Sequence, residues 1–187
     1  MTGSHKDMGR NRSIDRDKVL DVAEEIVTTR GAAALTIAAV AEAAGITKGG
    51  VQSCFSTKEV MIRAMLERWS ADEEARFREE LGGKKGVRDR VTAHARVTVS
   101  SGVANERAAG LLIALLQSPQ YLDVVQSWYA DRMAGLEGDS PVARKCRLAF
   151  LAVEGAFFLR YFGMGKMSEK QWADSFADIR KLLAEIR

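Results

Sequence analysis

The run Thr47-Lys48-Gly49-Gly50 combines residue types whose spacing suits binding to a negatively charged partner. A threonine in this position can cap a helix, the lysine carries a positive charge, and the two glycines leave the backbone uncovered. Glycine in a helical turn costs about 1 kcal/mol relative to alanine, and two of them add nothing to a core. Free N–H groups at a helix start, a cation and bare backbone together favour contact with a phosphate strand.

Two short helices separated by Gly45 are expected to position this run. Thr36 and Thr47 stand where N-caps belong, and Gly45 can adopt the left-handed conformation that ends the first helix. Apolar residues recur at helical spacing on both sides: Ile37, Val40, Ala41 and Ala44 before the glycine, then Ile46, Val51 and Cys54 or Phe55 after it. The pattern predicts a helix-turn-helix whose second helix can enter the DNA major groove. The alternative is a helical hairpin inside an ordinary all-α core.

The stretch from Leu35 to Glu59 resembles the DNA-binding domain of TetR-type repressors. The resemblance rests on Leu35-Thr36-Ile37, on Ala44-Gly45-Ile46-Thr47-Lys48-Gly49-Gly50-Val51, and on Phe55-Ser56-Thr57-Lys58-Glu59. It implies an all-α protein, in which an N-terminal three-helix helix-turn-helix domain precedes a C-terminal helical bundle for ligand binding and dimerisation. The chain departs from the family pattern at Gln52, where a tyrosine is usual, and at Ser53 and Cys54, where an aromatic residue or histidine is common.

From these residues and the resemblance we predict a set of DNA contacts. The set comprises Arg12, Thr36, Thr47, Lys48, Gly49, Gly50, Gln52, Ser53 and Lys58. The family's tyrosine generally contacts a phosphate; Gln52 can donate a hydrogen bond there or read an adenine edge instead. Lys58 matches a lysine that reaches a phosphate in the family, the alternative being a solvated surface charge.

Composition limits the other classes of function. The chain has 187 residues, 47% of them hydrophobic, only 2 prolines, and a net charge of +3, so DNA affinity must come from a few placed cations. Its 2 cysteines have no metal-ligand or disulfide spacing. We therefore expect a cytoplasmic protein with no metal, no cofactor, no membrane span and no signal peptide. No catalytic motif is present, so an enzyme is not expected.

The chain is expected to divide into three parts. Residues 1–13 are polar and contain arginines, which favours a flexible basic arm on DNA or, alternatively, a solvated tail. Residues 14–57 form the helix-turn-helix domain, and residues 58–187 form the effector-binding and dimerisation domain, with a helix from Lys58 connecting the two. In the second domain, Asn105 is expected to cap a helix that starts at Glu106.

The last two helices are candidates for an association surface. Gly155 and nearby alanines (Ala149, Ala152 and Ala156) give the first of them a face of small residues. The second has an apolar stripe of Trp172, Phe176, Ile179, Leu183 and Ile186. Such a stripe is more often internal core, but the resemblance implies dimerisation through the last two helices and favours a homodimer seam. A dimer would present two recognition helices to a palindromic double-stranded operator.

A pocket for a small-molecule effector in the C-terminal bundle is also implied by the resemblance. The candidate lining residues are His94, Trp128, Phe150, Glu154 and Phe157. Glu154 lies in the apolar run LAFLAVEGAFFL, so its carboxylate needs a partner. That partner can be a buried arginine or lysine, a hydrogen-bond donor or a ligand cation. The aromatic residues make a ligand cation one candidate; the alternative is an arginine of the protein, such as Arg96 or Arg107, or exposure to solvent.

The sequence thus predicts a TetR-like, sequence-specific DNA-binding regulator, a repressor released by a small molecule. The alternative is a helical interaction module that does not bind specific DNA.

Overall fold

The computed structural model describes residues 14–116 and 122–186, and all regular structure in these residues is helical. In chain order the elements are α1 (Arg16–Arg30), the short 3-10 helix η1 (Ala32–Ala34), α2 (Ile37–Ala43), α3 (Lys48–Cys54), α4 (Lys58–Leu81), α5 (Val87–Ser100), α6 (Gly102–Leu116), α7 (Leu122–Met133), α8 (Pro141–Tyr161) and α9 (Glu169–Ala184). The predicted all-α class is confirmed. The predicted arm, with Arg12, lies outside the described residues, as does the residue Arg187.

Capping threonines determine where α2 and α3 begin, and a glycine turn separates the two helices. The Thr36 side chain accepts a hydrogen bond from the N–H of Ala39 at 3.0 Å, and that of Thr47 accepts one from Gly50 at 3.0 Å. Between the helices Gly45 has φ of +66°, a left-handed value that glycine adopts without strain. The predicted helix-turn-helix is therefore present, with α1 packed against it.

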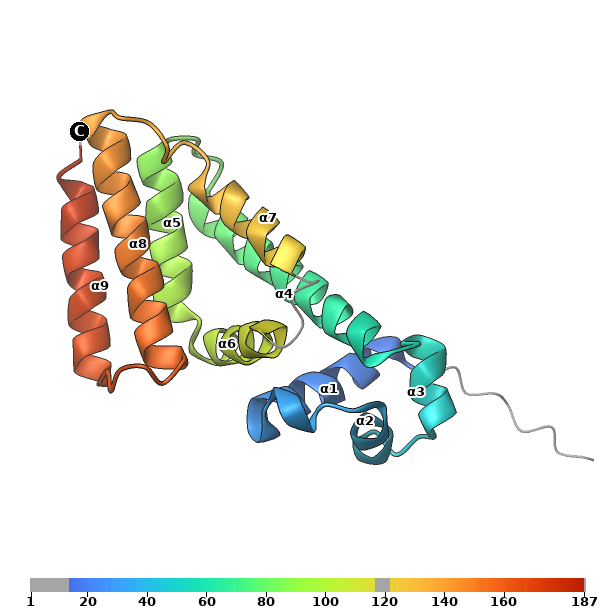
Figure 1. Cartoon of the computed structure of the whole chain (residues 1–187). Helices are drawn as coiled ribbons and strands as arrows, with labels where there is room; N and C mark the ends of the chain where they lie inside the picture. The colour runs from blue at the N-terminus through green and yellow to red at the C-terminus, as the bar shows by residue number, and fades with distance from the viewer. Residues whose placement is uncertain (1–13, 117–121, 187) are drawn as a thin grey trace, which may run out of the picture.

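The long helix α4 connects the two halves of the molecule (Figure 1). Thr57 caps its start, and Gly82, in the left-handed conformation, ends it. From the α1–α3 domain it runs diagonally to the top of a layer formed by α5, α8 and α9, with α7 along its side. Helix α6 lies between that layer and α1.

The apolar core of the N-terminal domain extends beyond residue 57. It contains buried residues of α1 to α3, such as Phe55, and of α4, such as Met65. It also contains Leu111 of α6 and Val125 of α7. The N-terminal domain and the C-terminal helices therefore share one continuous core.

The apolar stripe of α9 belongs to the interior of the chain. Its members Trp172, Phe176, Ile179 and Leu183 are all buried in a cluster with α5 and α8, as is Ile186 just beyond the end of the helix. The small residues of α8 divide between two faces, because Ala149 and Ala156 are buried whereas Ala152 and Gly155 are exposed. The expectation that the α9 stripe forms a dimer seam is thus wrong: a periodic stripe shows which face is apolar, but not which partner covers it.

Asn105 does not cap a helix. Helix α6 starts at Gly102, before Asn105 and not after it. The buried side-chain amide of Asn105 donates to the carbonyl of Thr98 at 2.7 Å. Its side chain therefore joins α6 to the end of α5.

Candidate nucleic-acid interface and inner cavity

The first turn of α3 is open to solvent. Thr47, Lys48 and Gly49 are exposed, and so are Gln52 and Ser53 one turn further along. A Cβ atom added to Gly49 would meet nothing closer than the Thr47 hydroxyl, at 3.9 Å. An external strand can therefore approach the Gly49 backbone closely, as the sequence suggested.

Gly50 differs from this expectation. It is buried, and a Cβ atom there would lie 2.7 Å from Cδ1 of Ile14. Its missing side chain makes room for that of Ile14, which covers Gly50 and is itself partly exposed. The predicted DNA contact through Gly50 is corrected accordingly.

Two other predicted contacts have additional structural partners. Thr36 is exposed, but its oxygen caps α2. Lys58 is half-buried, and its Nζ donates to the carbonyl of Ala32 at 3.5 Å. An ammonium group has three donors, so this contact leaves capacity for a phosphate. Arg16, which stacks on the ring of Phe55 with its Cζ atom 4.5 Å from the centroid, is an exposed cation near α3 that the sequence did not single out.

An inner cavity of about 30 Å³ lies between α4, α5, α6, α7 and α8, a volume that fits about one water molecule. Of the five predicted lining residues, four are found there: His94, Trp128, Glu154 and Phe157. Phe150 does not line it. Its ring stacks behind His94, with the ring centroids 4.9 Å apart.

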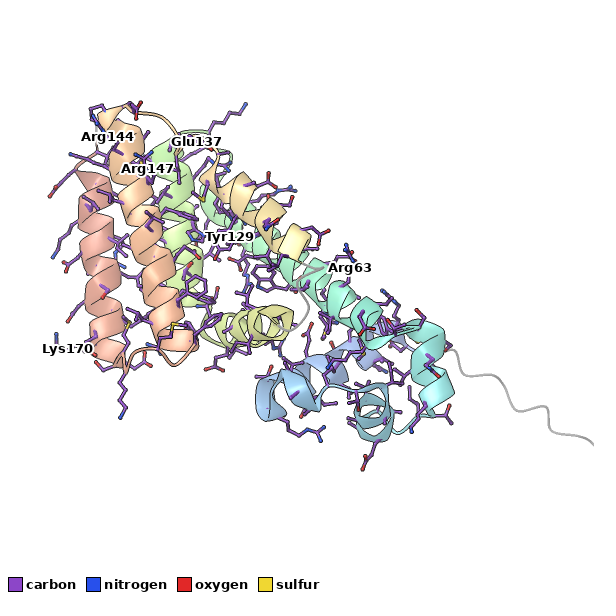
Figure 2. All side chains as sticks on the ribbon, viewed as in Figure 1. Arg63, Tyr129, Glu137, Arg144, Arg147 and Lys170 are labelled. Atoms are coloured by element: carbon purple, nitrogen blue, oxygen red, sulfur yellow. The ribbon has the colours of Figure 1, made fainter. Side chains whose placement is uncertain are left out.

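Glu154 receives two hydrogen bonds from other helices. His94 Nε2 of α5 lies 2.8 Å from one carboxylate oxygen, and the hydroxyl of Tyr129 of α7 donates to the other at 2.5 Å. Tyr129 lies on the side of α7 that faces the α5–α8 layer (Figure 2). Burial and the negative charge of Glu154 raise the pKa of the Tyr129 phenol, so it remains a donor.

The arginines that the sequence offered as partners of Glu154 bind other carboxylates. Arg96 pairs with Glu80 at 3.6 Å, and Arg107 approaches Glu24 at 4.0 Å. Tyr129, which stands beside Trp128 in the chain, lines the cavity but was not among the predicted lining residues. The other lining residues that were not predicted are Trp69, Glu73, Thr98, Asn105, Ala108 and Leu112.

Charged residues connect α1 to the helices around the cavity. Glu24 of α1 accepts from Arg68 of α4, with 2.7 Å between Arg68 Nη2 and the carboxylate, and Arg68 also pairs with Asp21 at 2.9 Å. At Gly110, α6 approaches α1 so closely that an added Cβ atom would lie 3.2 Å from Val27. Helix α6 thus touches both α1 and the cavity.

Within the described residues, no group of three or more His, Cys, Asp and Glu side chains could hold a metal ion. No helix among them is long and apolar enough to cross a membrane.

Comparison with known families and proteins gives matches over both halves of the chain. Residues 88–184 match the family model for the tetracyclin repressor-like C-terminal domain. Residues 19–65 match the model for bacterial regulatory proteins of the tetR family. The HTH-type transcriptional repressor KstR2 of Rhodococcus jostii (strain RHA1) is 33% identical over 100 residues, which are 54% of this chain and 48% of that protein. The alignment therefore spans about half the length of this relative.

Solved structures share the fold. The crystal structure of a transcriptional regulator from Rhodococcus sp. Rha1 has a TM-score of 0.71 at 18% identity, covering 92% of this chain and 96% of the other. A mutant of the TetR family transcriptional regulator CifR, complexed with 26 bp double-strand operator DNA, has a TM-score of 0.61 at 19% identity, covering 96% and 100%. At such identities the likeness concerns the fold.

Proposed function

The chain belongs to the TetR family of bacterial transcriptional regulators, and from this membership we propose that it is a dimeric repressor. It binds a palindromic DNA operator through α3 and is released by a small organic effector bound in the inner cavity. As a regulator of transcription it acts in the cytoplasm, and we assign it no enzymatic activity.

The observation that carries the DNA-binding proposal is the open first turn of α3. Lys48 supplies a charge, the Gly49 backbone lets a phosphate strand approach, and Gln52 and Ser53 follow on the exposed side of the helix. In this scheme Lys48 and Lys58 contact phosphates, and Gln52 contacts a phosphate or an adenine edge. The operator-bound structure of CifR supports the scheme through its shared fold.

The exposed apolar face of α8 supports the dimer. Leu148, Leu151 and Leu159 leave 62%, 53% and 44% of their surfaces exposed, and Gly155 lies between them with open space around it. These positions fall on one stripe of the helix. Covering this stripe with the same stripe of a second copy gives a two-fold dimer, whose two α3 helices would face DNA sites about 34 Å apart.

Helix α6 is the proposed route from effector to DNA. Asn105, Ala108 and Leu112 line the cavity, whereas Gly110 and Leu111 lie against the N-terminal domain. An effector that enlarges the cavity displaces α6, and with it α1. Release requires the effector to bind the arrangement that does not fit DNA more tightly, with a coupling free energy of about 1–3 kcal/mol.

The test is binding to labelled DNA that flanks the protein's own gene, measured by fluorescence anisotropy at several salt concentrations. Lys48→Ala is expected to weaken specific binding and to make the salt dependence shallower by about two counterions per dimer. Lys170→Ala, an exposed lysine that pairs with Asp174 on α9, is the matched control and should change neither. If no saturable, sequence-dependent binding is seen, the alternative of a helical interaction module is supported instead.

A further inference from the structure

The inner cavity is lined by acidic groups from two different helices. Glu73 of α4 and Glu154 of α8 both line it. Glu73 is paired with Arg76, with 2.7 Å between the carboxylate and Arg76 Nη2. Glu154 has no lysine or arginine within 4 Å in the described part of the chain, and its partners are His94 and Tyr129. Glu154 is therefore held by an imidazole and a phenol, with no lysine or arginine beside it in the described residues.

His94 is a buried neighbour of Glu154. Its side chain is almost fully buried, and Nδ1 has no hydrogen-bond partner in the part of the chain that the structure describes. The ring stacks on Phe150, with the ring centroids 4.9 Å apart. The carboxylate of Glu154 is therefore the acidic group of the cavity that a bound cation can neutralise.

Aromatic faces surround this charge. Trp69 and Trp128 have ring centroids 5.4 Å apart, and Tyr129 meets Trp128 edge to face at 4.9 Å. Phe157 completes the aromatic lining. The negative faces of aromatic rings attract cations, most strongly for tryptophan, and the attraction grows when water is excluded. The rings and the carboxylate therefore favour the same sign of charge.

Space for a larger body lies on the other side of Trp69. A groove of about 370 Å³ between α1, α4 and α6 is lined by Trp69, which also lines the inner cavity. The apolar residues Ala75, Ala104 and Leu111 form part of the groove, and the charged residues Glu24, Asp72, Arg76 and Arg107 form the rest. A rotation of the half-buried Trp69 side chain would join the two spaces. Their combined volume falls within the range of about 300–1,000 Å³ that is usual for ligand sites.

We propose that the effector is an amphipathic organic cation, an amine or quaternary ammonium compound with an aromatic or aliphatic body; this inference rests on the proposed function. The cationic group lies against Trp69, Trp128 and Glu154. The apolar body extends past Trp69 into the groove beside α6, the helix that contacts α1.

The test compares three probes of similar shape with the full-length protein in the absence of DNA. They are 4-phenylbutyltrimethylammonium, the uncharged compound in which carbon replaces its nitrogen, and a phenylalkanoate of matched length. Binding is followed by quenching of tryptophan fluorescence, since two tryptophans line the cavity, and by calorimetry. The ammonium probe is expected to bind at least about tenfold more tightly than either of the others. Equal binding of the uncharged probe, or tighter binding of the carboxylate, would overturn the proposal.

A matched pair of variants locates the charge that matters. Glu154→Gln should lower the affinity for the ammonium probe about tenfold and change that for the uncharged probe less than about twofold. Glu80→Gln removes an exposed carboxylate that pairs with Arg96 and does not line the cavity. This control variant should therefore leave the affinity for the ammonium probe unchanged. An unchanged ammonium affinity in folded Glu154→Gln protein would contradict the proposal. The comparison of probes on the unmodified protein decides the matter if this variant fails to fold.

Two further outcomes separate the cation site from the proposed repressor function. Tight, Glu154-dependent binding of the ammonium probe without release of operator DNA would sustain the cation site and overturn effector-controlled repression. Release of DNA by the carboxylate probe alone would sustain the repressor and overturn the cation site.

Discussion

Replacing Arg132 on α7 tests how a buried charge is tolerated beside the cavity. Its side chain is only 2% exposed and pairs with Glu74 of α4 at 2.6 Å. The guanidinium carbon lies 3.8 Å from the ring centroid of Phe77 and 4.9 Å from that of Trp128. Its Nε and Nη2 atoms are buried without a hydrogen-bond partner within residues 14–116 and 122–186.

The favourable and unfavourable contributions of Arg132 are similar in size. The charged hydrogen bond to Glu74 contributes about 1.5–3 kcal/mol, and each ring contact contributes about 0.5–2 kcal/mol. Against these, two buried donor groups without partners cost about 1–3 kcal/mol each. Glu74 keeps Arg78 as a second partner at 2.6 Å and is partly exposed, so removing Arg132 does not leave an isolated buried charge.

Arg132→Met should therefore change the free energy of unfolding by no more than about 1–2 kcal/mol, because it fills the same space without the unsatisfied donors. Arg132→Ala also creates a cavity and should be about 2–5 kcal/mol less stable than Arg132→Met. Urea unfolding followed by circular dichroism, at one fixed protein concentration, measures both values. If Arg132→Met is as unstable as Arg132→Ala, the ion pair dominates and the reasoning is refuted.

Three further predictions concern pH, the recognition helix and the dimer. Burial acts to raise the pKa of Glu74, but hydrogen bonds and charges from Arg132 and Arg78 outweigh burial and lower this pKa. The ionised Glu74 therefore stabilises the fold at a pH above the unfolded-state pKa of about 4.3, and this stabilisation is lost as the pH falls through the pKa of the folded state. The urea midpoint should thus drop on acidification below about pH 4, and less so in Arg132→Met. Gly49→Ala should stabilise α3 by up to about 1 kcal/mol, which raises the midpoint temperature of thermal unfolding. The added methyl group should also weaken DNA binding in anisotropy titrations. A lower midpoint temperature would contradict the open position of Gly49. Leu151→Glu should convert dimers to monomers in analytical ultracentrifugation, whereas Lys170→Glu should not; a dimeric Leu151→Glu protein would exclude the α8 face.

The parts of the fold that the sequence predicted are those governed by local chemistry. Thr36, Gly45 and Thr47 define the helix-turn-helix because capping and left-handed glycine act within a few residues of the chain. Asn105 shows the limit of this reasoning. A capping residue type was present, but its amide found a better partner in the carbonyl of Thr98, and α6 started earlier.

The cavity residues were predictable in part, because an acidic residue in an apolar stretch of a helix stands out in the sequence. The position of Glu154 in an apolar run required a buried partner, and this expectation holds, but the partners lie on α5 and α7. Tyr129 is 25 residues away from Glu154 along the chain, and no periodicity within one helix indicates such a contact. Phe150 was assigned to the cavity by residue type, whereas packing places it behind His94.

The shared core has a consequence for attempts to build chimeric regulators. Leu111 and Val125, which come from the C-terminal half, fill the same apolar interior as the helix-turn-helix residues. Transplanting residues 14–57 onto another regulator would separate that interior from these two side chains and from the buried residues of α4, such as Met65. A successful graft must therefore also supply apolar residues that match those of α4, α6 and α7, so the two halves of this protein cannot be exchanged independently.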